Sequence, residues 1–363
     1  MAEFAARQRT NALRRVSAED IPAVYDLYRA IEPRDPILLE AFGRWWRWLY
    51  VDNPRRLSVV LGSFDAAGRN IGHLALMPID FLIDGELVLA CSAVQLMVAE
   101  EQRRTLLYPT LVREFFSAYQ KNGCDFCYAA VTRPRVLAAN LALGFRKNAH
   151  LSVYARPYRF ETLARSKLGP AAAYLRPAFW LAEKVARLAG PFSGRPFTVL
   201  EARSFPETFA PLLQATLAQF KLVALRTVPI LNWRFVANFD RGYRILLASE
   251  NGQPAGYAVV RRMPMREFET LAIVDILFDL DRPAAGHALL RQVHGIAVSE
   301  GVDMAVTLLS EHSPFRRVLR RWGFLKTPEQ FTLITHEPKN GRHRLTERPF
   351  TDWHVTWFDH DFV

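Results

Sequence analysis

The strongest candidate for chemistry is a basic turn between an expected strand and an expected helix. The apolar run at residues 94–98 indicates a buried strand, and Leu107 and Leu111 begin a series of apolar residues four apart that indicates a helix. Arg103 and Arg104 stand between the two elements. The first N–H groups of a helix lack intrahelical acceptors, and the helix dipole is positive at that end. We therefore expect this turn to bind a phosphate or another anion.

The stretch resembles the central motif of the GNAT superfamily of N-acyltransferases, in which a strand leads into an Arg/Gln-x-x-Gly-x-Gly/Ala turn. The matching residues here are Arg103-Arg104-Thr105-Leu106-Leu107-Tyr108, with Leu106 and Tyr108 at the positions that are small in the family. The resemblance implies that the turn holds the pyrophosphate of acetyl-CoA or another acyl-CoA, and that the pantetheine arm lies along the preceding strand. It predicts a cofactor site formed by Leu96, Met97, Val98, Arg103, Arg104, Thr105, Leu106, Leu107, Tyr108 and Asn140, with no metal.

The chain also repeats its own landmarks in order. Trp46 matches Trp233, Gly72 matches Gly256, Arg103 matches Arg282, and Gly144-Phe145 matches Gly323-Phe324, so the offset drifts from 187 to 179 without a jump. Short loop deletions in a second copy of one α/β unit would produce this drift. The element order of each copy is similar to that of the GNAT fold. We therefore predict an α/β protein of two tandem GNAT-like domains, each a central mixed β-sheet flanked by helices.

Acyl transfer from a thioester to an amine needs a proton acceptor and an N–H group facing the developing oxyanion. The resemblance implies that the amide next to Met97 or Val98 is the oxyanion donor. Where the family often has a glutamate base, the first copy has Val94 and Gln95, and the second has Asp275. Burial in an apolar strand would raise the pKa of Asp275 and suit a base. A paired structural carboxylate is the alternative, and no complete catalytic set is visible.

Either copy could hold the cofactor. The first has Arg103, Arg104 and nearby Arg113. The second has Arg282 followed by small residues, but Asp279 and Asp281 precede it and would repel a pyrophosphate. We favour the first copy, with the second shaping the acceptor site.

The predicted domains are residues 1–155, a helical linker at 156–197, residues 198–336 and a tail at 337–363. The expected helix at 171–188 has a broad apolar face, so it could pack between the copies or make peripheral contact with a membrane. The tail contains Asp359-His360-Asp361, but adjacent strand residues point in opposite directions, so we expect a last strand laid back on one copy rather than a metal site.

The composition indicates a globular protein. Of 363 residues, half are hydrophobic, and the apolar runs are much shorter than a membrane span needs. With no signal-peptide pattern at the N-terminus, we expect a cytoplasmic protein. The formal charge of +11 fits acidic partners such as acyl carrier protein, while the dispersed arginines argue against nucleic acid. Cys124 and Cys127 lack a second pair and are expected to be buried small hydrophobes on opposite faces of a strand.

The resulting hypothesis is an N-acyltransferase that moves an acetyl or other acyl group from a CoA thioester to a small-molecule amine. The two-copy arrangement resembles GNAT proteins of bacterial cell-surface polysaccharide systems, which suggests an amino sugar as the acceptor. A FemABX-like aminoacyltransferase using charged tRNA is one alternative. A non-catalytic protein that binds acyl-CoA or acts as a scaffold is the other.

Overall fold

The computed structural model describes residues 12–33, 35–169, 179, 183–184, 197–238 and 241–360. The chain forms two compact units. The first comprises residues up to Asn148 together with Thr332–Arg348, and the second comprises Ala149–Phe331 and the residues from Pro349 onward. Most of the predicted linker helix at 171–188 lies outside the described residues. No helix in the described part of the chain is long and apolar enough to cross a membrane.

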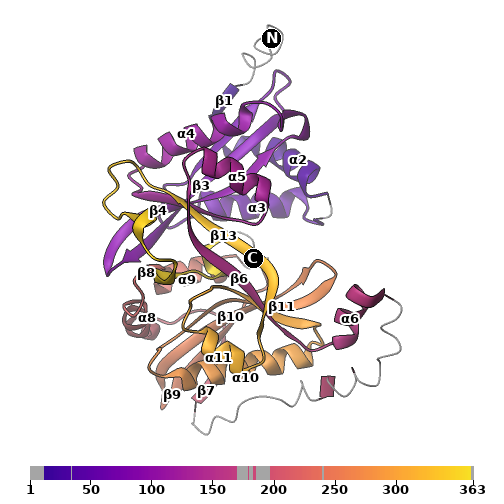
Figure 1. The fold of residues 1–363 in the computed structure, drawn as a ribbon, viewed down its shortest axis with the longest axis vertical. Helices are drawn as coiled ribbons and strands as arrows, with labels where there is room; N and C mark the ends of the chain where they lie inside the picture. The colour runs from indigo at the N-terminus through magenta and orange to yellow at the C-terminus, as the bar shows by residue number, and fades with distance from the viewer. Residues whose placement is uncertain are drawn as a thin grey trace. The chain divides into compact units, whose positions relative to one another are not determined.

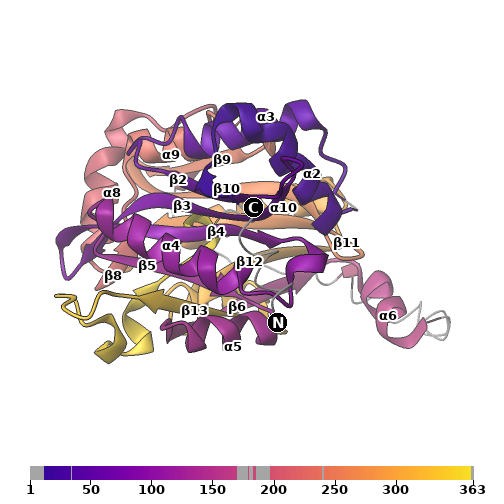
Figure 2. The same cartoon turned by 90° about the horizontal axis from the view of Figure 1, so that it is seen from above.

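The first unit is a mixed sheet with the strand order β1-β2-β3-β4-β5-β13. Its neighbours are antiparallel except for β4 and β5, which run parallel. Helices α2 and α3 cover one face and α4 and α5 the other (Figure 2). The elements are β1 (Ala12–Arg15), α2 (Ile21–Ile31), α3 (Leu39–Tyr50), β2 (Val59–Phe64), β3 (Asn70–Ile83), β4 (Glu86–Val98), α4 (Leu107–Lys121), β5 (Phe126–Val131), α5 (Pro134–Ala142) and β13 (Leu325–His336).

The second unit has the corresponding order, β7-β9-β10-β11-β12-β6, again with one parallel pair, β11 and β12. Mixed α/β architecture with a helix-flanked mixed sheet is therefore confirmed. The elements are β6 (Arg146–Pro157), α6 (Phe160–Leu168), β7 (Phe197–Ala202), α8 (Ala210–Leu217), β8 (Leu222–Ala224), α9 (Val228–Phe235), β9 (Arg244–Glu250), β10 (Gln253–Met265), β11 (Phe268–Phe278), α10 (Pro283–Ser299), β12 (Met304–Ser310), α11 (Arg316–Arg321) and β14 (Trp353–His354).

The last strand of each unit comes from the other half of the sequence. In the first unit β5 pairs with residues 332–336 of β13, and in the second β12 pairs with residues 151–157 of β6 (Figure 1). The predicted domains, residues 1–155 and 198–336, do not include this exchange of strands between the two units. The alternating apolar pattern of β6 and β13 suits either partner, so the sequence pattern alone does not decide between them.

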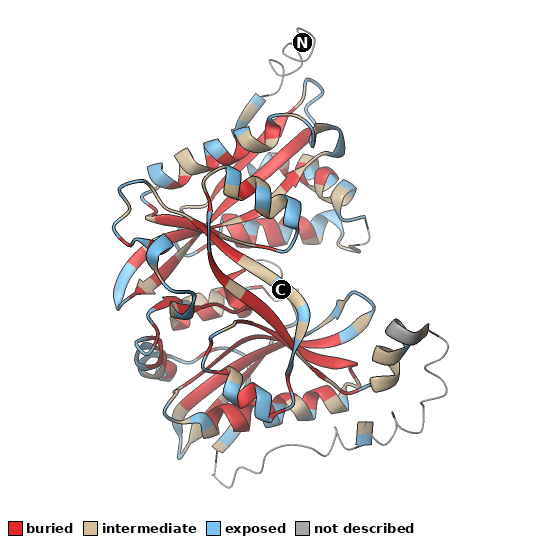
Figure 3. Cartoon of the chain, in the orientation of Figure 1, coloured by how far each residue is buried: buried red, intermediate tan, exposed pale blue. Residues whose placement is uncertain are grey.

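The central strands of each sheet are the most deeply buried elements, whereas the edge strands β1 and β7 are not (Figure 3). In the first unit α4 packs closely on the sheet because Gly72 of β3 leaves room for Leu107 and Leu111, and a Cβ at that position would come within 3.0 Å of both side chains. At its repeat partner Gly256 a Cβ would lie 2.8 Å from Phe278 Cβ and 2.9 Å from the Leu277 carbonyl oxygen of β11, and 3.2 Å from Leu289 of α10. The first glycine thus makes room for the helix, and the second for the neighbouring strand as well as the helix.

The three cysteines are free and share one core cluster in the first unit. Cys124 precedes β5 rather than lying in it, so the prediction that Cys124 and Cys127 point to opposite faces was wrong. Burial of both residues is confirmed. Among the described residues, no group of His, Cys, Asp and Glu side chains is arranged to hold a metal ion.

Candidate functional site

A β-bulge interrupts strand β4 directly before the basic turn. His73 of β3 pairs with Met97 and Ala75 pairs with Val94, so Gln95 and Leu96 together oppose one residue. Gln95 takes a positive φ of 52°, a conformation that a side chain other than glycine rarely adopts. A bulge re-aims the groups that follow it, and bulges often lie beside functional sites.

Neighbouring side chains hold the bulge in place. The Nδ1 atom of His73 lies 2.9 Å from the Gln95 carbonyl oxygen, and the Tyr50 hydroxyl donates a 3.0 Å hydrogen bond to Gln95 Oε1. His73 is fully buried, and burial lowers its pKa to about 4. The imidazole is therefore neutral at pH 7, so Nδ1–H donates to the carbonyl while Nε2 carries the lone pair.

Beyond the bulge, β4 has a free edge on its β5 side. The parallel pairing covers only residues 90–92 of β4 and 126–128 of β5. Within the described part of the first unit, no other strand pairs with residues 93–98 on that side. An extended ligand could pair with this edge as an added strand does.

The basic turn begins where the free edge ends. Three backbone N–H groups, those of Arg104, Leu106 and Tyr108, make no hydrogen bond to any described residue. The Arg103 and Arg104 side chains are exposed, and neither forms an ion pair within the described chain. Glu100 and Glu101 begin the same turn, in a short 3-10 helix that ends at Gln102. Free amides, two guanidinium groups without an ion pair and a helix N-terminus are features that favour the binding of an anion.

The bulky residues of the predicted motif leave these amides accessible. Leu106 is 60% exposed and has φ near −81°, so its backbone has no need for glycine. Tyr108 packs against the core under α4, and burial raises its pKa to about 12. Thr105 is tied into the turn, because its hydroxyl donates to the Gln102 carbonyl and accepts from the Leu107 amide.

The other predicted cofactor residues lie as follows. Leu96, Met97 and Val98 form the free edge of β4, and the Val98 carbonyl accepts a long 3.4 Å hydrogen bond from Arg103 Nε. Asn140 is buried in α5, where its side-chain amide donates to the Val136 carbonyl one turn earlier. Its participation in cofactor binding stays a prediction.

The second unit has a bulge at the corresponding place, between Ile273 and Asp275 of β11. Asp275 is fully buried and accepts hydrogen bonds from Arg226 at 2.9 and 3.2 Å, from Tyr257 at 2.6 Å and from Thr356 at 2.8 Å. Burial alone would raise the pKa of Asp275, but the Arg226 charge and these donors outweigh it and hold the pKa below its ordinary value. The expectation of a raised pKa was therefore wrong, and the alternative of a paired structural carboxylate fits.

The C-terminal tail lies between the diverging ends of β11 and β12. The Ser310 amide of β12 donates to the Val355 carbonyl at 3.2 Å, while Thr356 bonds Asp275 of β11. The tail's short strand β14 pairs with β8, which confirms a last strand laid back on the second copy. In the second unit the tail thus occupies the position that corresponds to the free edge in the first.

In the turn after β11, side chains of the second unit accept hydrogen bonds from two of the backbone amides. The Leu280 amide donates to Gln219 Oε1 and the Asp281 amide to Asp279 Oδ1, each at 3.0 Å. The Arg282 guanidinium is paired with Glu250. Of the residues that match Arg104 and Leu106, Pro283 has no N–H group and the Ala285 amide donates to the Arg282 carbonyl at 3.1 Å, so the free amides and arginine of the first turn have no free counterpart at these positions of the second.

No protein-family model matches the chain, and no curated protein matches it in sequence. Its fold is similar to that of solved N-acyltransferases. A probable N-acyltransferase from Enterococcus faecalis V583 has a TM-score of 0.60 at 11% identity, and a GCN5-related N-acetyltransferase from Anabaena variabilis has 0.61 at 12%. Each comparison covers 90% of this chain and 72% of the other. The N-myristoyltransferase of Saccharomyces cerevisiae with bound myristoyl-CoA has a TM-score of 0.63 at 11% identity, covering 90% and 82%. The chain therefore has the GNAT fold.

Proposed function

We propose that this protein is an N-acyltransferase that takes its acyl group from an acyl-CoA bound at the bulge and basic turn of the first unit. One observation carries the proposal: the free amides of Arg104, Leu106 and Tyr108 and two unpaired arginines follow directly on a free strand edge. A diphosphate fits the former and a pantetheine arm, with its two amides, fits the latter. The same elements of the second unit are occupied by its own side chains and tail.

In the proposed reaction the amine nitrogen attacks the thioester carbonyl, the C–N bond forms and the C–S bond breaks. In this proposal an amide on the strand edge, that next to Met97 or Val98, faces the developing oxyanion. The side-chain hydrogen bonds to Gln95 in the described chain come from Tyr50 and His73, which supply no carboxylate base, and in this proposal the amine proton passes through water to the departing thiolate. The His73 contact positions the bulge and moves no proton.

The acceptor in this proposal is a small amine, with an amino sugar of a cell-surface polysaccharide as the first compound class to test. An acyl carrier protein could replace CoA as the donor, since the same phosphopantetheine arm would use the same strand edge. The preferred acyl chain length is determined by comparing the binding of a series of donors from acetyl-CoA to myristoyl-CoA.

Calorimetric titration with this series tests the donor site. Arg103→Glu and Arg104→Glu should each weaken acyl-CoA binding by about tenfold or more, because each replaces a charge-assisted phosphate contact with a repulsive carboxylate. Arg282→Glu is the matched control and should bind as the unmodified protein does. Retained binding in both first-unit variants, with loss in Arg282→Glu, would move the site to the second unit. Absence of binding to every acyl-CoA would contradict the proposed donor.

Turnover is measured by release of free CoA thiol on addition of glucosamine. Acyl-CoA binding without thiol release to any amine would favour a non-catalytic acyl-CoA-binding protein. If the protein neither binds acyl-CoA nor releases thiol but does bind charged tRNA, the aminoacyltransferase alternative would be favoured.

A further inference from the structure

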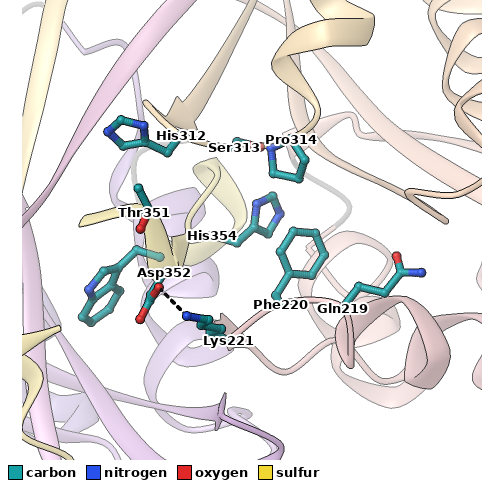
Figure 4. Close-up of a pocket in the computed structure, with 10 residues that line it drawn as sticks. Gln219, Phe220, Lys221, His312, Ser313, Pro314, Thr351, Asp352 and His354 are labelled. Atoms are coloured by element: carbon teal, nitrogen blue, oxygen red, sulfur yellow. Dashed lines mark ion pairs between the residues drawn. The ribbon is translucent and has the colours of Figure 1, made fainter. Parts of the chain in front are cut away.

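The second unit contains a cavity of about 270 Å³ that the proposed reaction does not use. Its walls come from residues 219–221, the loop at 312–314 and residues 351–354 of the tail (Figure 4). Its size suits a small organic molecule rather than one or two waters, each of which takes about 30 Å³.

A buried carboxylate with a weakly held counter-ion lines the cavity. The Asp352 side chain is 8% exposed, and its ion pair is with Lys221 Nζ at 3.3 Å (Figure 4). Lys221 is 67% exposed, so its ammonium sits on a flexible stem at the solvent side. A buried carboxylate needs a cation, whereas an exposed lysine gains little from staying in one place.

Two further polar groups in the walls lack partners. Ser313 Oγ and both ring nitrogens of His354 make no hydrogen bond to any described residue, although Ser313 is 5% and His354 2% exposed. Polar groups buried without partners are costly, and ligands often supply the missing bonds. The aromatic rings of Phe220 and Trp353 complete the lining.

We propose that this cavity binds a small organic primary amine in its ammonium form, with Asp352 as the counter-ion in place of Lys221. The rings of Phe220 and Trp353 favour a cation as well. The Asp352 carboxylate disfavours an anionic ligand. The site lies wholly within the second unit and does not depend on acyl-CoA binding.

Calorimetry with paired probes tests the site. Glucosamine and phenethylamine are compared with N-acetylglucosamine and N-acetylphenethylamine, which lack only the ammonium group. The free amine of at least one pair should bind, and its N-acetyl partner should bind at least about tenfold more weakly, because hydrogen bonds to charged groups contribute on the order of 2 kcal/mol. Equal binding of both partners, or of neither, would overturn the proposal.

Two substitutions give opposite expected results. Asp352→Asn should remove amine binding, whereas Lys221→Met should strengthen it severalfold because it removes the internal competitor. Lys339→Met, at another exposed lysine, is the control and should change nothing. Weaker or unchanged binding in Lys221→Met would contradict the exchange of ammonium groups even if Asp352→Asn failed to fold. All titrations are done without acyl-CoA, so failure here is separate from failure of the donor site.

Discussion

Acidification from near pH 7 to near pH 5 is expected to remove about 5 kcal/mol of the free energy of unfolding. Burial lowers the pKa of His73 and His336 to about 4, and that of His354 and His360 to about 3. An unfolded histidine titrates near pH 6.5, so between that pH and about 4 the unfolded chain binds more protons than the folded one. Each of the four therefore stabilises the fold above pH 6.5 and loses that contribution as the pH falls.

One carboxyl acts in the opposite direction. Burial raises the pKa of Asp359 to about 6, so the folded state binds the extra proton between about pH 4 and pH 6 and gains stability as the pH falls. It offsets roughly one histidine of the four. A loss of this size is comparable to the whole stability of many domains, so acid unfolding is expected between pH 4 and pH 6.

Urea unfolding near pH 7 and near pH 5 measures the effect. His354→Leu should reduce the pH dependence, because His354 stacks on Phe220, meets Phe315 edge-on and makes no hydrogen bond to a described residue. His312→Gln, at an exposed histidine, is the control. An unfolding free energy that stays constant over this range would contradict the prediction, because it would mean that these histidines take up protons in the fold over the same pH range as in the unfolded chain.

Arg226→Met is expected to destabilise the second unit by about 3–5 kcal/mol, because it leaves the Asp275 carboxylate buried without its cation. Arg226 and Asp275 are both fully buried, and the Arg226 ring-face contact with Phe358 at 4.3 Å is lost as well. Asp275→Asn should reduce the stability less in the Arg226→Met background than in the unmodified protein. In the single variant it leaves the buried Arg226 charge without its partner, whereas in the double variant neither charge remains and the side-chain oxygen of the new asparagine still accepts the Tyr257 hydrogen bond.

A double-mutant cycle by thermal or urea unfolding checks this coupling. Arg262→Met is the matched control in the same unit, since Arg262 and its partner Glu269 are each 51% exposed and loss of this pair should cost much less. Additive losses in the cycle would mean that Asp275 does not depend on Arg226. The same variants also test function, because Asp275→Asn should leave acyl-CoA binding unchanged if the first unit holds the cofactor.

The sequence predicted the features that local patterns determine better than it predicted the contacts between residues that are far apart in the chain. Residues 94–98 form the end of β4, and Leu107 begins α4, as the apolar spacing indicated. The bulge at Gln95 was not predicted, since nothing in the residue types there requires a positive φ. Asp275 was predicted to be buried, but its partners Arg226 and Thr356 are 49 and 81 residues away, beyond the reach of any local pattern. The closing of the second turn by Gln219 and Asp279 was missed for the same reason.

The exchange of last strands has a consequence for how the protein is made. Strand β5 of the first unit pairs with residues 332–336, which leave the ribosome only after strands β7 to β12 of the second unit have been synthesised. The first unit, with its proposed donor site, therefore stays unfinished during translation while the edge of β5 is exposed to other chains. Protection of that edge, by a chaperone or by transient pairing with the nascent β6, becomes a requirement of biosynthesis rather than of catalysis.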